Sequence, residues 1–120
     1  MRSTELPAIS AGPVGFRRVP ESQSGVQFIN SLDEWSGAAN RVLYNGAGLA
    51  AGDVNGDGLP DLFFCDLGGT NRLYLNRGGW RFEEATSRAG LSQPLRYSRG
   101  AVLADLDGDG DDDLIAAVED

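Results

Sequence analysis

The 120-residue sequence contains no histidine, no lysine and a single cysteine, Cys65. Without histidine, the chain cannot form a Ser-His-Asp or Cys-His catalytic site or a histidine-ligated zinc site. The lone cysteine excludes a disulfide within the chain, and its place in an apolar run favours a buried core side chain over a reactive thiol. No apolar stretch approaches the roughly 18 residues of a membrane-spanning helix, so no membrane span is predicted.

Basic charge is also scarce, because ten arginines stand against 18 acidic residues and the net charge is −8. The arginines form no cluster, and nucleic-acid phosphates require a positively charged face, so we expect no nucleic-acid binding. Six of the twelve aspartates lie between residues 105 and 113. Because 41% of the residues are apolar, the composition indicates a folded core with acidic loops rather than a disordered acidic chain.

Two nine-residue stretches, 53–61 and 105–113, share one plan. Acidic or amide side chains stand at the first, third, fifth and ninth places, and glycine stands at the fourth and sixth. The oxygen-bearing residues are Asp53, Asn55, Asp57 and Asp61 in the first stretch, and Asp105, Asp107, Asp109 and Asp113 in the second. The glycines are Gly56, Gly58, Gly108 and Gly110.

This plan is typical of a calcium-binding loop. Ca²⁺ takes six to eight oxygen ligands at about 2.3–2.6 Å, so a short loop must turn alternate side chains toward one centre. The seventh place, Leu59 or Asp111, would supply a backbone carbonyl, and the glycine before it permits the sharp turn. Without a cation the second stretch would suffer strong repulsion, since like charges about 4 Å apart cost on the order of 4 kcal/mol at an effective dielectric of roughly 20. The sequence therefore predicts two Ca²⁺ sites.

Two other interpretations compete with this one. Asp, Asn and Gly also dominate ordinary solvated turns, but two matched stretches are a stronger signal than one. An EF-hand needs a glutamate at the twelfth place and a helix on each side, whereas the twelfth residues here are Phe64 and Ala116. The flanking segments are short apolar runs bounded by Gly and Asp, which favours strands. Each loop is therefore predicted to join the two strands of a hairpin.

An internal repeat connects the two loops. Aligning Asp53 with Asp105 gives a shift of 52 residues, which also places Gly48 on Gly100. A period near 50 residues is in the range of β-propeller blades. Two further strands are predicted between the loops, at residues 71–76 and 81–86, so that one repeat would hold four strands.

The predicted fold class is all-β, in the form of an incomplete β-propeller. It would have one full four-stranded blade at residues 47–87 and partial blades on either side. We divide the chain into a flexible lead-in at 1–15, part of a preceding blade with an inserted loop at 16–46, a first repeat at 47–98, and a truncated second repeat at 99–120. The lead-in lacks the apolar segment of a secretory signal peptide.

Residues 48–64 and 71–76 resemble FG-GAP repeats of the VCBS and cartilage-acidic-protein-like (ASPIC/UnbV) type, which integrin alpha subunits share. The resemblance covers residues 16–120, and its motifs are specific for the repeat without naming an activity. It implies a β-propeller whose Asp-rich loops bind Ca²⁺ between the first two strands of a blade. By position it implies one site at Asp53, Asn55, Asp57, the Leu59 carbonyl and Asp61, and another at Asp105, Asp107, Asp109, the Asp111 carbonyl and Asp113.

The predicted function is structural and adhesive. Ca²⁺ would fix each loop and its hairpin, and neighbouring blades would build a surface for a protein or carbohydrate partner. Calcium loops of moderate affinity fill where calcium is near millimolar, which favours an extracellular or periplasmic location; export itself is implied by the resemblance. The alternative is an accessory binding module of a larger secreted enzyme.

The chain itself is predicted not to be an enzyme. The adjacent acids Glu83 and Glu84 could in principle serve a glycosidase. Adjacent strand residues point to opposite faces of a sheet, however. A solvated strand edge with one acid near Arg81 is therefore the favoured interpretation.

Overall fold

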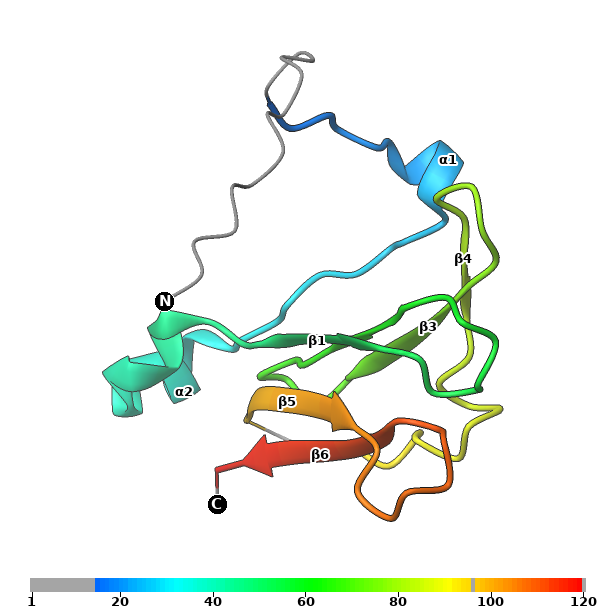
Figure 1. The fold of residues 1–120 in the computed structure, drawn as a ribbon. Coiled ribbons are helices and arrows are strands. Elements are labelled where there is room, and N and C mark those ends of the chain that lie inside the picture. The colour runs from blue at the N-terminus through cyan, green and yellow to red at the C-terminus, as the bar shows by residue number, and fades with distance from the viewer. Residues whose placement is uncertain (1–14, 96, 120) are drawn as a thin grey trace, which may run out of the picture.

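Two antiparallel sheets and a few short helices make up the structure, a computed structural model that describes residues 15–95 and 97–119 (Figure 1). The helical elements are α1 (Glu21–Ser24), α2 (Glu34–Ala39) and the 3₁₀ helix η1 (Arg41–Asn45). The strands are β1 (Leu49–Gly52), β2 (Asp61–Phe64), β3 (Arg72–Asn76) and β4 (Phe82–Glu84) in the first sheet, and β5 (Ser98–Ala104) and β6 (Asp113–Val118) in the second. The predicted all-β class is confirmed.

The first sheet is a meander in the order β1-β2-β3-β4, with each strand antiparallel to the next. The pairing of β1 with β2 runs from Leu49↔Phe64 to Gly52↔Asp61. Buried and less buried residues alternate along β2, as expected of a strand that turns one face to the core. The sheet lies within residues 47–87, where the sequence predicted a four-stranded unit.

The second sheet is the hairpin β5-β6, paired from Ser98↔Val118 to Ala104↔Asp113 with an irregularity between Ser98 and Gly100. It occupies the place of the first two strands in the predicted second repeat. Two sheets form no closed ring in the part of the chain that is described, so the propeller stays a proposal.

Residues 15–46 contain α1, α2 and η1, and no strand lies in this range. The assignment of residues 16–46 to a preceding blade stays a prediction, as do the other domain boundaries. Trp35, in the predicted inserted loop, lies in α2 and is 87% exposed. The predicted lead-in falls almost entirely on residues 1–14, outside the described residues. No helix in the described ranges is both long and apolar enough to cross a membrane.

The hydrophobic core lies between the two sheets. Ala50, Phe63 and Leu73 of the first sheet are buried and belong to one cluster with Leu103 of β5. Cys65 lies in the same cluster, and burial raises the pKa of its thiol. The interpretation of this cysteine as a core residue is therefore confirmed, and the contact between the sheets is apolar.

Residues at equivalent positions of the two repeats lie on different sides of the contact between the sheets, so that one is buried and the other is exposed. Phe63 is 1% exposed, whereas its equivalent Ile115 on β6 is 48% exposed. Leu103 packs against the first sheet, whereas its equivalent Ala51 lies on the other face of that sheet, beside a largely apolar cavity. The second sheet thus contacts the first sheet through the face that is equivalent to the outer face of the first sheet. The two sheets are stacked in one direction.

The outer face of the first sheet is partly covered by residues 26–28. The ring of Phe28 lies 4.8 Å from that of Phe64, and Phe64 meets Tyr74 edge to face at 5.7 Å. The Tyr74 hydroxyl donates a hydrogen bond to the Gln27 carbonyl at 2.9 Å and accepts one from the Gln27 N–H at 3.2 Å. Aromatic packing and a satisfied hydroxyl tie this N-terminal segment to the sheet.

The buried carboxylate of Asp66 anchors the residues that come next in the chain, at Ser31. Asp66 has no exposed surface, and it accepts hydrogen bonds from the Ser31 N–H at 2.6 Å, the Thr70 N–H at 2.9 Å and the Thr70 hydroxyl. Burial by itself raises the pKa of Asp66, but the donors outweigh burial and the pKa lies below its ordinary value. An ionised Asp66 therefore joins the segment at Ser31 to the turn after β2.

Replacing Phe63 with Ala should lower the free energy of unfolding by about 3–5 kcal/mol, because a buried ring is lost and a cavity remains. Ile115→Ala, at the equivalent exposed position, is the matched control and should cost less than about 1 kcal/mol. Urea denaturation followed by circular dichroism measures both values. Equal losses for the two variants would contradict the stacking direction.

Replacing Asp66 with Asn should lower the free energy of unfolding at pH 7 by about 2–3 kcal/mol. One carboxylate oxygen becomes an NH₂ group, so the buried N–H groups that donated to this oxygen lose their acceptor. Since the folded-state pKa is lowered, the contribution of Asp66 is present above the ordinary value of 3.8 and is lost as the pH falls through the folded-state value. Denaturation between about pH 7 and pH 2 should therefore show the two proteins converging in acid. A constant difference would refute this role for the carboxylate.

Candidate metal centre

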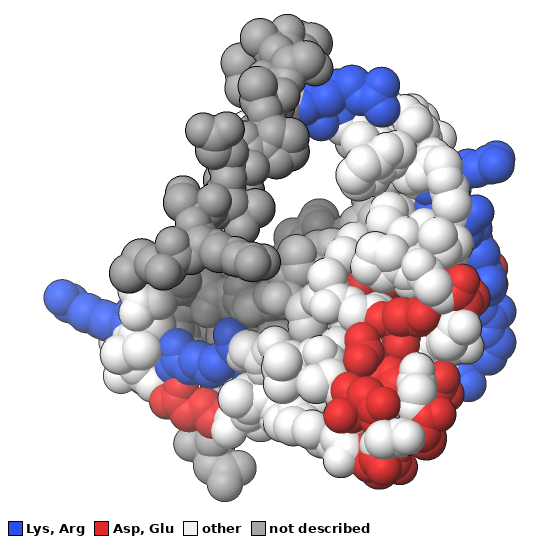
Figure 2. All heavy atoms as spheres, viewed as in Figure 1, with Lys and Arg blue, Asp and Glu red and all other residues white. Residues whose placement is uncertain are grey.

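Both predicted calcium loops lie at the same end of the molecule. The first connects β1 to β2 and the second connects β5 to β6, each within an antiparallel hairpin (Figure 1). Figure 2 shows acidic side chains gathered at this end. The predicted placement of the loops between hairpin strands is confirmed.

The glycines of both loops adopt left-handed backbone conformations. The φ angles are +71° at Gly56 and +81° at Gly58, and +80° at Gly108 and +101° at Gly110. A residue with a Cβ resists this region, whereas glycine enters it freely. The fourth and sixth places therefore turn the backbone in the same way in the two loops.

The carboxylate at the first place organises each loop. Asp53 accepts a hydrogen bond from the Gly58 N–H at 2.7 Å, and Asp105 accepts the equivalent bond from the Gly110 N–H at 3.1 Å. The Gly58 N–H is the largest cause of a lowered pKa at Asp53, with further N–H groups of the loop adding to it. Backbone donors thus hold this carboxylate in its charged form.

The third and fifth places follow the same pattern. In each case the side-chain oxygen accepts a hydrogen bond from the backbone N–H two residues later, at 2.9–3.1 Å. The acceptors are Asn55 and Asp57 in the first loop and Asp107 and Asp109 in the second. Such local bonds turn the side chains back over their own loop.

Residues at the seventh place take part in these bonds through their N–H groups. Leu59 donates to Asp57 and Asp111 donates to Asp109. The role of the Leu59 and Asp111 carbonyls as cation ligands stays a prediction.

The ninth place differs between the loops. Asp61 is fully buried and accepts from the Val54 N–H at 3.1 Å and from the Asn76 N–H at 2.7 Å. Burial raises the pKa of Asp61, and these two donors oppose the rise. Asp113 accepts the equivalent bond from the Leu106 N–H at 3.0 Å but is exposed. The difference arises because β3 supplies Asn76 beside β2, whereas β6 borders only β5 in the described chain.

The second loop brings three carboxylates together. Oxygens of Asp105, Asp107 and Asp109 all lie within 4.8 Å of one another. Two ligands on opposite sides of Ca²⁺, each at about 2.3–2.6 Å, stand about 4.6–5.2 Å apart, so this spacing fits around one such ion. In the described part of the chain no other His, Cys, Asp or Glu group meets this spacing, and in the first loop the third place is the amide Asn55.

Sequence reasoning gave no role to Asp112, although this residue contacts the first loop. The Asp53 N–H donates to the Asp112 carboxylate at 2.8 Å, and the Asp112 N–H donates to the Asp53 carbonyl at 2.9 Å. The only signal in the sequence was the excess of carboxylates in the second loop. Asp66 was also missed, since no repeated pattern marks it.

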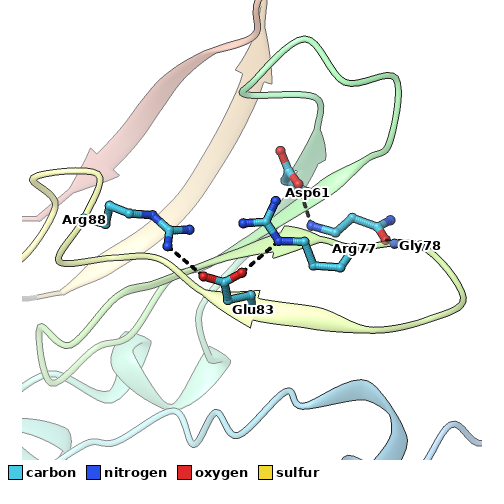
Figure 3. A network of polar contacts seen from close by, with 6 residues as sticks. Asp61, Arg77, Gly78, Glu83 and Arg88 are labelled. Atoms are coloured by element: carbon cyan, nitrogen blue, oxygen red, sulfur yellow. Dashed lines mark hydrogen bonds and ion pairs between the residues drawn. The ribbon is translucent and has the colours of Figure 1, made fainter.

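The acids considered for glycosidase chemistry lie elsewhere. Glu83 on β4 forms ion pairs with Arg77 at 2.8 Å and Arg88 at 2.7 Å (Figure 3). The Arg88 and Arg77 side chains lower the pKa of Glu83. The partners are not Arg81, which the sequence suggested, but the interpretation as an exposed strand edge fits this arrangement.

Comparison with known proteins identifies the repeat. A family model describing the FG-GAP-like repeat matches residues 53–116, from the first loop to the strand after the second. The chain belongs to the FG-GAP-like repeat family. The resemblance predicted from the sequence is thereby confirmed, and the match spans both Asp-rich loops.

The chain is also similar to cartilage acidic protein 1. It is 31% identical over 97 residues to the proteins of Homo sapiens and Mus musculus, which covers 80% of this chain and 15% of each relative. Against the Xenopus tropicalis protein, identity is 31% over 70 residues, covering 58% of this chain and 11% of the relative. The chain thus spans less than a sixth of these curated relatives. No solved structure matches it significantly.

Gly58→Ala should lower the free energy of unfolding by about 1–2 kcal/mol, because the left-handed conformation penalises a Cβ. The space around this glycine is open, so strain alone is tested. Gly100→Ala is the matched control, since Gly100 also has open space but no left-handed φ. It should be neutral or slightly stabilising. A loss as large at Gly100 as at Gly58, measured by urea denaturation, would contradict the explanation.

Proposed function

We propose that this FG-GAP-like repeat chain is a calcium-binding β-propeller module with a structural and partner-binding role. The observation that carries the proposal is the agreement between the loops. Four side-chain-to-backbone hydrogen bonds of the first loop recur at equivalent positions in the second. The FG-GAP family membership supports the same conclusion.

The residues present suit Ca²⁺. Every candidate ligand is an oxygen of a carboxylate, an amide or a backbone carbonyl, which a hard cation prefers. Zinc favours thiolate and imidazole, but the chain has no histidine and its one cysteine is buried. The proposed first site is Asp53, Asn55, Asp57, the Leu59 carbonyl and Asp61. The proposed second site is Asp105, Asp107, Asp109, the Asp111 carbonyl and Asp113.

The metal would act structurally. Each loop links two neighbouring strands, so a cation that holds the loop closed also fixes the hairpin register. Ca²⁺ at 100 times its dissociation constant would add about 2.7 kcal/mol of stability for each site. The larger benefit is expected at the second loop, whose carboxylates are exposed and mutually repulsive.

The propeller form is supported by the stacking of the two sheets. Because equivalent faces point the same way, the Ile115 face of β6 could pack against a further sheet, just as the equivalent Phe63 lies in the buried cluster that includes Leu103 of β5. Repetition of this contact would build a ring of blades.

The complete ring would offer a surface to a protein or carbohydrate partner in an extracellular or periplasmic setting. Loops of moderate calcium affinity are filled in such a setting. The chain itself would not be an enzyme, since it has no histidine and Glu83 is engaged by arginines. An accessory binding module of a larger secreted enzyme is the second candidate, because the chain spans only a part of its relatives.

Isothermal titration of the chain with CaCl₂ should show two sites, with the second loop binding more tightly because it has one more ligand carboxylate. Asp57→Ala should abolish the first site and leave the second measurable. Glu83→Ala removes an equal charge outside the loops and is the matched control. Absence of binding heat, together with an unchanged melting temperature on adding calcium, would refute the proposed function.

A further inference from the structure

The two Asp-rich loops are joined by a two-way hydrogen-bond bridge. The Asp53 N–H donates to the Asp112 carboxylate at 2.8 Å, and the Asp112 N–H donates back to the Asp53 carbonyl at 2.9 Å. Asp53 is the first proposed ligand of the first site. Asp112 lies between two proposed ligands of the second site, Asp111 and Asp113. The bridge therefore connects one ligand set directly to the other.

The first repeat leaves room for this bridge through its glycines. A Cβ on Gly52 would lie 2.5 Å from an oxygen of the Asp112 carboxylate, and a Cβ on Gly56 would lie 2.8 Å from an oxygen of Asp111. Gly52 has no left-handed φ, so the requirement here is for space. Two successive carboxylates of the second loop thus rest against the first loop.

The contact runs in one direction along the repeat. The residue of the first loop equivalent to Asp112 is Pro60, which has no carboxylate, and the residue equivalent to Gly52 is Ala104. The bridge is therefore no general consequence of the repeat pattern. It is specific to this pair of loops.

We propose that Asp112 is a positioning residue for the first Ca²⁺ site and couples that site to the second, an inference that rests on the proposed calcium binding. A cation held by the Asp111 carbonyl and Asp113 fixes the backbone on both sides of Asp112. Its carboxylate then holds the backbone of Asp53, so the first loop loses less conformational freedom when its own cation binds. By linkage, a cation in the first loop strengthens the second site by the same factor.

The test is a CaCl₂ titration of the full ¹⁵N-labelled chain, followed by NMR. The amides of Gly58 and Gly110 report on the two loops separately, because each donates to the first carboxylate of its own loop. Asp112→Ala should weaken binding at the first loop about tenfold. Asp112→Asn should stay within about threefold of the unchanged chain, because the amide oxygen can still accept the Asp53 N–H.

The matched control is Glu34→Ala, which removes an equal charge in α2, at the opposite end of the molecule from the loops (Figure 1). It should move neither reporter. If Asp112→Ala does not fold, Asp112→Ser supplies the same test, since its shorter hydroxyl does not reach the Asp53 N–H. Gly52→Ala is unsuitable, because its Cβ would lie 2.6 Å from the Cβ of the buried Leu103 as well as 2.5 Å from the Asp112 carboxylate.

A second readout needs no calcium. In the metal-free chain, hydrogen exchange of the Asp53 amide should be about tenfold faster in Asp112→Ala than in the unchanged chain or in Asp112→Asn, since an amide without its acceptor opens more readily. The linkage is tested with Asp57→Ala. As a single substitution it should weaken Ca²⁺ binding at the second loop, but when it is added to Asp112→Ala it should have no such effect.

The outcomes separate the two proposals. If the unchanged chain shows no cation at either loop, the proposed function fails and the inference falls with it. If both loops bind Ca²⁺ but Asp112→Ala leaves the Gly58 titration unchanged, only the inference is overturned. A loss shared equally by Asp112→Asn would also overturn it, because charge rather than the hydrogen bond would then be responsible.

Discussion

The carboxylate at the first place of each loop is the constraint on which the acidic end of the molecule depends. Asp53 and Asp105 accept backbone N–H groups from the far side of their own loops, and such donors favour the charged form of the carboxylate. These bonds require left-handed turns, which the glycines at the fourth and sixth places provide. Closing the loops in this way gathers carboxylates that repel one another, and the repulsion is what a divalent cation would relieve.

The sheets support the two loops unequally. In the first loop, Asp61 is buried at the start of β2 and is also held by Asn76 from the neighbouring strand. In the second loop, Asp113 is exposed, and β6 borders only β5 among the described residues. Contacts within the protein therefore order the first loop more than they order the second loop. Under the proposed calcium binding, a cation would supply more of the order of the second loop, which agrees with the larger number of carboxylates in that loop.

Membership of the FG-GAP-like repeat family accounts for what the loops share, and the differences between the repeats account for what is particular to this chain. The hairpin, the glycines and the alternate oxygens recur at a shift of 52 residues. The bridge from Asp112 to Asp53 does not recur, because Pro60 and Ala104 stand at the equivalent positions. The repeat thus contains one contact, between Asp112 and Asp53, that joins the two loops directly.

The sequence by itself determined the repeat, the strands beside each loop and the residues that line the loops, because these follow from local patterns. Alternating oxygens, glycine positions and short apolar runs depend on neighbours a few residues away. Only the tertiary structure decided that Phe63 is buried while its equivalent Ile115 is exposed, and that Asp112 meets Asp53. The short helices within residues 15–46 and the buried Asp66 were likewise unforeseen. These features depend on which faces of distant segments pack together. The local sequence around two equivalent residues of a repeat does not indicate which of the two is buried.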